Sequence, residues 1–268
     1  YQYAEVFGIS VNMAAGVVSG DVTIVTDTLR SIEMISGSNF SDTYDATGFG
    51  SNSVNAGSNG TWNQFQGLGG DDTIFGNNNT QIGYWSSTSA VNVVFTSNNA
   101  GYADGAGSGH DVFTGVNSVG ASNYASVIDG RLNTSGLWLS GGSSNDTLYG
   151  GAGTDHLTGG AGNDTFAFST AIAGGNNVDT ITDFSAANDS IQLSSAIFAG
   201  LATDAGGQLS ASAFAVGTAT GAAPQIVFDA TTGALSYDSN GAGAGGSTQF
   251  ATLTNPPGTI DNHSFWVV

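Results

Sequence analysis

Cysteine is absent from the 268-residue sequence, so disulfides contribute nothing to its stability. Lysine is absent as well, and Arg30 and Arg131 are the only arginines, whereas Asp and Glu together number 21. The formal charge of −19 excludes nucleic acids and anionic membrane surfaces as expected partners, because like charges repel. No run of about 18 or more apolar residues occurs, so the sequence predicts no membrane insertion.

The strong negative charge accompanies a hydrophobic content of 40%. Such a charge is typical of disordered chains, whereas that much apolar surface indicates a buried core. Divalent cations that neutralise carboxylates on folding would reconcile the two observations. If the protein is extracellular, bound metal would also supply the stabilisation that disulfides give to many extracellular proteins. With 42 glycines and three prolines, strands and turns are expected to dominate over helices.

One nine-residue unit occurs three times without a gap at 141–167, as GGSSNDTLY, GGAGTDHLT and GGAGNDTFA. The sixth place is always Asp (Asp146, Asp155 and Asp164), and the eighth is always apolar. Glycines at the first, second and fourth places permit positive φ and let carbonyl oxygens converge. Because Ca²⁺ takes six to eight oxygens from carboxylates and carbonyls, the unit predicts stacked calcium-binding turns joined by short strands.

This pattern resembles the RTX calcium-binding nonapeptide repeat of bacterial type I secreted proteins. The segment 178–193 that follows it resembles the C-terminal region of serralysin-like proteins. The resemblance implies an all-β fold, a right-handed parallel β-roll or β-solenoid with a C-terminal β-rich cap. We expect three segments: degenerate RTX-like coils at 1–138, regular calcium-binding repeats at 139–168, and a cap with a secretion signal at 169–268.

The resemblance also implies ligands for several calcium ions. In the family, each ion lies between one turn, which gives carbonyls at places two and four, and the turn two units later, which gives carbonyls at places one and three. Both turns add the sixth-place Asp. One complete cage would therefore comprise Gly142, Ser144, Asp146, Gly159, Ala161 and Asp164.

Two further cages are expected to be less regular. One would use Gly151, Gly153 and Asp155, but the equivalent place two units later is not an Asp, so either Asp179 or Asp183 would close it. The other would start from Gly150, Ala152 and Asp155 and be backed by the irregular turn at 130–140.

Altered copies of the unit occur upstream. Residues 37–45 keep Asp42 and residues 67–75 keep Asp72, which makes both carboxylates candidate metal ligands. Residues 121–129 place Ser126 where Asp should be, so that turn is expected to have lost its metal. A longer repeat aligns 27–46 with 111–130 at a constant offset, which predicts successive coils of one solenoid.

Catalytic motifs are missing. The sequence contains neither H-E-x-x-H nor G-x-S-x-G, and its three histidines have no recognisable nucleophile partner, so we expect no enzyme in this chain. The last residues, 261–268, resemble the uncleaved C-terminal signal of type I secretion. The exporter is therefore an expected partner, and the protein is expected outside the cell or on its surface without an N-terminal signal peptide.

The sequence thus predicts a calcium-binding β-roll that folds on binding Ca²⁺ after type I secretion. We expect it to be part of a structural, surface-layer or adhesin-like protein, with self-assembly into a layer or filament. The alternative is the C-terminal secretion and folding module of a secreted protease or lipase whose catalytic domain is not in this chain. Upstream sequence with H-E-x-x-H or G-x-S-x-G would favour the alternative.

Overall fold

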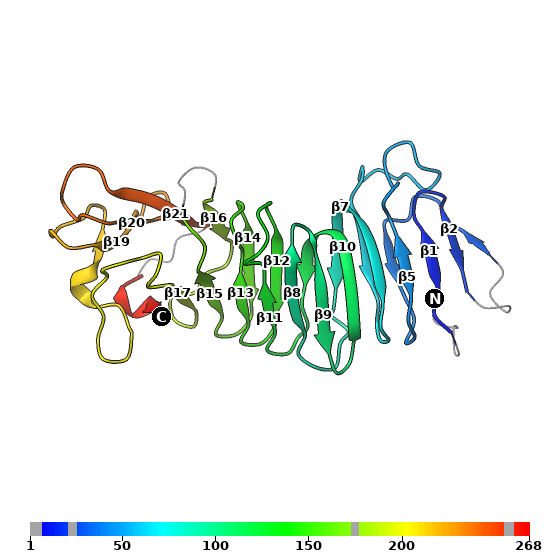
Figure 1. Ribbon diagram of the computed structural model, residues 1–268, viewed down its shortest axis with the longest axis horizontal. Coiled ribbons are helices and arrows are strands. Elements are labelled where there is room, and N and C mark those ends of the chain that lie inside the picture. The colour runs from blue at the N-terminus through cyan, green and yellow to red at the C-terminus, as the bar shows by residue number, and fades with distance from the viewer. Residues whose placement is uncertain (1–6, 21–25, 173–176, 255–259) are drawn as a thin grey trace. The chain divides into compact units, whose positions relative to one another are not determined.

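A computed structural model describes residues 7–20, 26–172, 177–254 and 260–268 (Figure 1). The chain forms two compact units, one ending at Ile128 and one beginning at Asp129. Among the described residues, the only helices are two 3₁₀ turns, η1 (Ala211–Ala213) and η2 (Asn262–Ser264). None of the described helices has the length and apolar character to cross a membrane. The predicted all-β fold is confirmed.

The first unit consists of strands joined by turns, and several of these turns are long. They are β1 (Ser10–Asn12), β2 (Val17–Ser19), β3 (Asp27–Thr28), β4 (Met34–Ser36), β5 (Thr43–Asp45), β6 (Asn63–Gln66), β7 (Thr73–Gly83), β8 (Asn92–Ser97), β9 (Ala100–Gly105) and β10 (Gly109–Gly120). A further strand, β11 (Val127–Asp129), lies at the boundary between the units.

Parallel pairing of β1, β5, β7 and β10 forms the coils of the first unit. Their central residues, Val11, Tyr44, Ile74 and Phe113, stand in register, and each is at most 2% exposed. These side chains form one column of the core, as expected for the apolar eighth place. Antiparallel pairs β1–β2 and β8–β9–β10 interrupt this regular pattern.

The second unit carries the regular repeats. Its strands are β12 (Trp138–Gly142), β13 (Thr147–Tyr149), β14 (His156–Gly160), β15 (Thr165–Phe168), β16 (Asp179–Ile181), β17 (Ser190–Leu193), β18 (Phe214–Val216), β19 (Gln225–Phe228), β20 (Ala234–Asp238), β21 (Ser247–Leu253) and β22 (Phe265–Val267).

Two parallel ladders form the β-roll of the second unit (Figure 1). One contains β12, β14, β16 and β21, and the other contains β13, β15, β17 and β22. The eighth-place residues of the three repeats face the core between the ladders and are fully buried. Strands β21 and β22 come from the C-terminal segment, so this segment extends both ladders.

The C-terminal segment also contains an antiparallel hairpin. Strands β19 and β20 pair antiparallel, and Gly233 in their turn has φ +76°, a conformation that favours glycine. Phe198 packs edge to face on Phe250 with ring centroids 5.0 Å apart, which fills the core of this region. The regular repeats and the cap thus share one compact unit. The three predicted segments are defined by how regular the repeats are. The two units are defined by contacts within each unit, so the two sets of boundaries differ.

Candidate calcium-binding turns

The sixth-place carboxylates of the second unit are linked from turn to turn through the backbone. The N–H of Asp146 donates to Oδ1 of Asp164 at 2.8 Å, and the N–H of Asp164 donates to Oδ1 of Asp189 at 3.0 Å. All three residues are buried, and the carboxylates of Asp164 and Asp189 are each held by the N–H of the preceding turn in the row. The turns therefore stack with one carboxylate per coil, as the nine-residue period predicts.

A second row of carboxylates lies on the turns of the other ladder. The N–H of Leu137 donates to Oδ1 of Asp155 at 2.7 Å, and the N–H of Asp155 donates to Oδ1 of Asp179 at 3.0 Å. Of the two alternatives for closing the second cage, Asp179 therefore occupies the stacked position. Asp183 instead accepts hydrogen bonds from the backbone N–H groups of Gly159 and Gly160, at 3.0 and 2.8 Å.

The six members of the predicted complete cage lie on two directly stacked turns. Besides the link between Asp146 and Asp164, the carbonyl of Gly142 accepts the N–H of Ala161 at 3.0 Å. A Cβ added to Gly141 would lie 2.6 Å from Oδ2 of Asp146 and 2.7 Å from the carbonyl oxygen of Gly159. These two predicted ligands thus converge on the space that the missing side chain leaves.

The fourth places of these two turns are also in contact. A Cβ on Gly162 would lie 2.5 Å from the carbonyl oxygen of Ser144, which places Ser144 directly against the later turn. The carbonyl of Ser144, which any residue at this place would supply, is the group that lies against the neighbouring coil. The structure therefore brings all six residues of the predicted cage together.

The carboxylates in these turns have the chemistry of cation ligands. Oδ2 of Asp155 and Oδ2 of Asp164 are buried without a hydrogen-bond partner. A Cβ on Gly150 or Gly159 would overlap the respective oxygen, so glycine at the first place leaves room for it. A buried anionic oxygen without a donor is costly, and a hard cation is the partner that removes this cost. The residues present therefore fit calcium.

Burial also raises the pKa of Asp155, Asp164 and Asp179, because the charged form loses hydration. No three His, Asp or Glu side chains form a metal cluster in the described residues. The predicted complete cage does not require one, since it uses two carboxylates and four carbonyls.

The other two predicted cages are less complete. The carbonyl of Asn133 accepts the N–H of Ala152 at 3.0 Å, so the irregular turn does back the turn that contains Gly150 and Asp155. Leu137 occupies its sixth place, and this pair of turns therefore has one carboxylate. For the cage of Gly151, Gly153 and Asp155, residues 173–176 two units later lie outside the described residues. Thr170 donates its hydroxyl to the carbonyl of Gly151.

The altered upstream repeats stack in the same way within the first unit. The N–H of Asp42 donates to Oδ1 of Asp72 at 2.8 Å, and the N–H of Asp72 donates to Oδ1 of Asp111 at 3.0 Å. Oδ2 of Asp72 is buried without a hydrogen-bond partner, like that of Asp164. Asp72 is therefore the upstream carboxylate that most resembles those of the regular repeats.

Sequence reasoning missed two of the stacked carboxylates, Asp111 and Asp189. Residues 106–114 read AGSGHDVFT, which fits the repeat at the second, fourth, sixth and eighth places and departs from it at the first, so Asp111 could have been found. Residues 184–192 read FSAANDSIQ and keep the sixth-place Asp and the eighth-place apolar residue without any glycine. Two matching places without glycine are too few to identify this segment as a repeat from the sequence.

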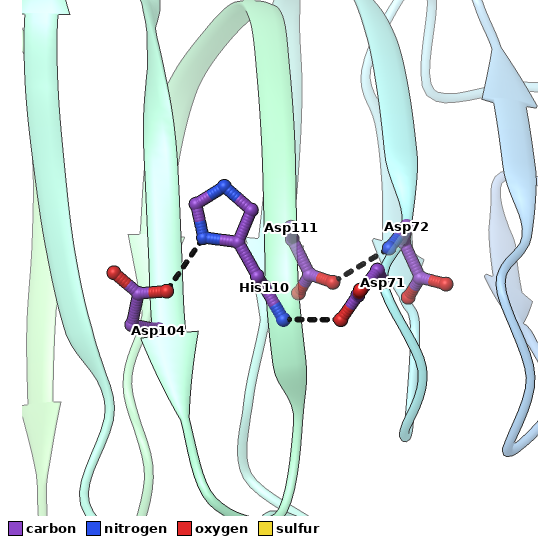
Figure 2. Close-up of polar contacts among 5 residues, drawn as sticks. All are labelled: Asp71, Asp72, Asp104, His110 and Asp111. Atoms are coloured by element: carbon purple, nitrogen blue, oxygen red, sulfur yellow. Dashed lines mark hydrogen bonds and ion pairs between the residues drawn. The ribbon is translucent and has the colours of Figure 1, made fainter.

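Fifth-place residues connect the turns as well. Figure 2 shows the N–H of His110 donating to Oδ1 of Asp71 at 2.8 Å, while Nδ1 of His110 lies 2.6 Å from Oδ1 of Asp104. In the second unit the N–H of Asn163 donates to Oδ1 of Asn145 at 2.9 Å. The shared pattern indicates that His110 belongs to a repeat turn.

Without calcium, we expect the free energy of unfolding to fall as pH rises from about 4 to about 9. Burial, followed by the charge of Asp111, raises the pKa of Asp72 to about 9, and burial raises the pKa of Asp111 to about 6. Above pH 3.8, the folded state therefore binds more protons than the unfolded state. The stabilisation that these protonated carboxyls give is complete below that pH and is lost as the pH rises through their folded pKa values. A difference of one between the folded and unfolded pKa of a group is worth about 1.4 kcal/mol.

Circular dichroism in excess chelator at pH 4.5 and pH 8 measures this effect. Asp72→Asn should flatten the pH dependence, whereas Asp27→Asn, at an exposed residue of β3, should leave it unchanged. A chelated chain with more β-structure at pH 8 than at pH 4.5 would show that the sign is wrong.

Comparison with protein-family models matches residues 58–80 and 138–166 to the RTX calcium-binding nonapeptide repeat. The chain therefore carries these calcium-binding repeats, which indicate a secreted protein. Among solved structures, the extracellular lipase LipA from Serratia marcescens is similar at 16% identity, with a TM-score of 0.23. The alignment covers 90% of this chain and 39% of the lipase chain, so the present chain spans well under half of that length. No curated protein matches the sequence.

Proposed function

We propose that the chain is a non-enzymatic folding module that becomes ordered when several calcium ions bind its stacked turns after type I secretion. The observation that carries this proposal is the buried Oδ2 of Asp155 and of Asp164, which have no hydrogen-bond donor. When bound, Ca²⁺ supplies positive charge between carboxylates that repel each other. The residues that would hold it in the second unit are those of the stacked turns at 141–146, 150–155, 159–164 and 184–189, together with Asp179.

The chain's own residues prepare these turns. Backbone N–H groups fix Oδ1 of Asp155 and of Asp164, and the first-place glycines Gly150 and Gly159 leave space beside Oδ2 of each. Linkage gives the scale, since a site saturated one hundredfold above its Kd adds about 2.7 kcal/mol to the free energy of unfolding. Several such sites could match the roughly 5–15 kcal/mol that is typical of a whole domain.

Hydrogen exchange of the full chain tests where calcium acts. In calcium, we expect slow exchange throughout 139–168, because β12 to β15 are then paired. In excess chelator at neutral pH, the same peptides should exchange at the rate of an unfolded chain. Equal protection under both conditions would refute calcium-coupled folding of the repeats.

We propose that the exporter reads the C-terminal tail before the chain folds. Two observations support this order. The tail at 261–268 resembles a type I signal, and Phe265 is fully buried in β22, which pairs with β17. A folded chain would therefore hide part of the signal. Deleting 261–268 should abolish export from cells that carry a type I exporter, and continued export would contradict this role.

We also propose a structural role at the cell surface, with assembly into a layer or filament. The sequence supports a non-catalytic chain, because it contains neither H-E-x-x-H nor G-x-S-x-G. Electron microscopy of the purified chain in calcium should show ordered assemblies that chelator disperses. Monodisperse particles at all concentrations would instead favour the module of a secreted hydrolase.

A further inference from the structure

The turns of the regular repeats share a second-place glycine in a distinctive conformation. Gly142, Gly151 and Gly160 have φ of +124°, +116° and +99°, which L side chains rarely adopt. With no side chain at this place, nothing from the second residue reaches the sixth-place carboxylate. In the turns of Asp155 and Asp164, Oδ2 of that carboxylate is buried without a donor.

The upstream turn at 37–42 has serine at its second place. The Oγ of Ser38 lies 3.2 Å from the carbonyl oxygen of Phe40 and 2.9 Å from Oδ1 of Asp42. The N–H of Ser38 donates to Oδ2 of Asp42 at 2.7 Å, and the N–H of Ile9 donates to Oδ1 at 2.6 Å. Both oxygens of this buried carboxylate are therefore satisfied by donors of the protein itself.

The turn at 121–126, which aligns with 37–42 in the longer repeat, shows the same arrangement. The Oγ of Ser122 lies 3.3 Å from the carbonyl oxygen of Tyr124 and 3.1 Å from Oγ of Ser126. The N–H of Val91 donates to Oγ of Ser126, as the N–H of Ile9 does to Asp42 in the earlier turn. This turn has Ser126 at the sixth place instead of an Asp, yet the hydroxyl of Ser122 still lies between the fourth-place carbonyl and the sixth-place side chain.

We propose that the second-place residue decides whether a turn takes calcium. A second-place glycine leaves the turn open to the ion, whereas the hydroxyl of Ser38 or Ser122 closes it. The reason is that the hydroxyl lies between the fourth-place carbonyl and the sixth-place side chain. In a glycine turn, these two positions supply predicted calcium ligands. Asp42 is then a structural carboxylate and not a calcium ligand. The inference rests on calcium binding by the glycine turns.

The number of calcium ions bound to the full chain tests this assignment. Equilibrium dialysis followed by metal analysis should give the same number for Asp42→Asn as for the wild type. Asp164→Asn should bind at least one ion fewer, which shows that the assay detects the loss of a site. A lower number for Asp42→Asn would overturn the inference while leaving calcium binding by the glycine turns intact.

A pair of serine substitutions provides the converse test. Ser38→Gly should bind one ion more than the wild type. Glycine removes the hydroxyl from Asp42 and can also adopt the positive φ of Gly142, Gly151 and Gly160, and in the turns of Asp155 and Asp164 no N–H reaches Oδ2. Ser122→Gly is the matched control and should gain none, because Ser126 offers no carboxylate. No gain for Ser38→Gly would overturn the inference, and a wild-type chain that binds no calcium would overturn both it and the proposed function.

Discussion

Asp164→Asn is expected to raise the calcium concentration at half-maximal folding by about tenfold or more, equal to about 1.4 kcal/mol. Asp164 accepts the N–H of Asp146 and donates its own N–H to Asp189, so it lies in the middle of a row of three stacked turns. An asparagine keeps an acceptor for the N–H of Asp146 but loses the charge. The expected loss therefore comes from calcium binding and not from an unsatisfied backbone group.

Asp204→Asn is the matched control for this substitution. Asp204 is exposed and accepts the N–H groups of Gly206 and Gln208 in a surface turn of the same unit. Calcium titrations of both variants, followed by far-ultraviolet circular dichroism, measure the difference. Equal midpoints for the two variants would exclude Asp164 as a ligand.

Phe166→Ala is expected to lower the free energy of unfolding by about 3–5 kcal/mol even in saturating calcium. Phe166 is fully buried between the two ladders of the second unit, in register with Leu148 and Ile191. The core between two sheets of short strands is thin, so few other side chains can fill the cavity. Because folding and calcium binding are linked, the calcium midpoint should rise as well.

Phe75→Ala is the control for the loss of a phenylalanine. Phe75 is 40% exposed on β7, so its removal should cost much less. Urea denaturation in saturating calcium compares the two variants. Equal stabilities would mean that the eighth place does not form the core.

The regular part of the fold could be predicted because its period is unbroken. Asp146 and Asp164 are separated by two whole repeat units, and that constant step gives both the stacking of the turns and the predicted cage. The eighth-place apolar residues follow from the same period, because they recur at equal intervals and face one core. Each of these predictions used only the sequence of 141–167.

The irregular part could not be predicted from the period because the steps between turns vary. Asp72 and Asp111 are 39 residues apart, since β8 and β9 are inserted between their turns. Asp164 and Asp189 are 25 residues apart. A fixed step of two repeat units misses both partners. Residues 106–114 could have marked Asp111 as a sixth-place Asp, but only the three-dimensional register of the strands shows that it stacks on Asp72.

The roles of some single residues were also beyond the sequence. Leu137 stands where the third cage would need an Asp, and this became visible only through its N–H bond to Asp155. Ser38 had no distinguishing mark in the sequence beyond its match to Ser122. The hydrogen bonds of its hydroxyl depend on a turn conformation that the residue pattern does not specify.

The most direct measurement is a calcium titration of the full chain at neutral pH, followed by far-ultraviolet circular dichroism. Starting from excess chelator, we expect an unfolded spectrum that converts to a β-sheet spectrum as Ca²⁺ is added, returns when chelator is restored, and does not convert with Mg²⁺. Mg²⁺ should fail because it prefers near-ideal octahedral geometry and keeps several waters. A β-sheet spectrum that persists unchanged in excess chelator at neutral pH would contradict folding by calcium.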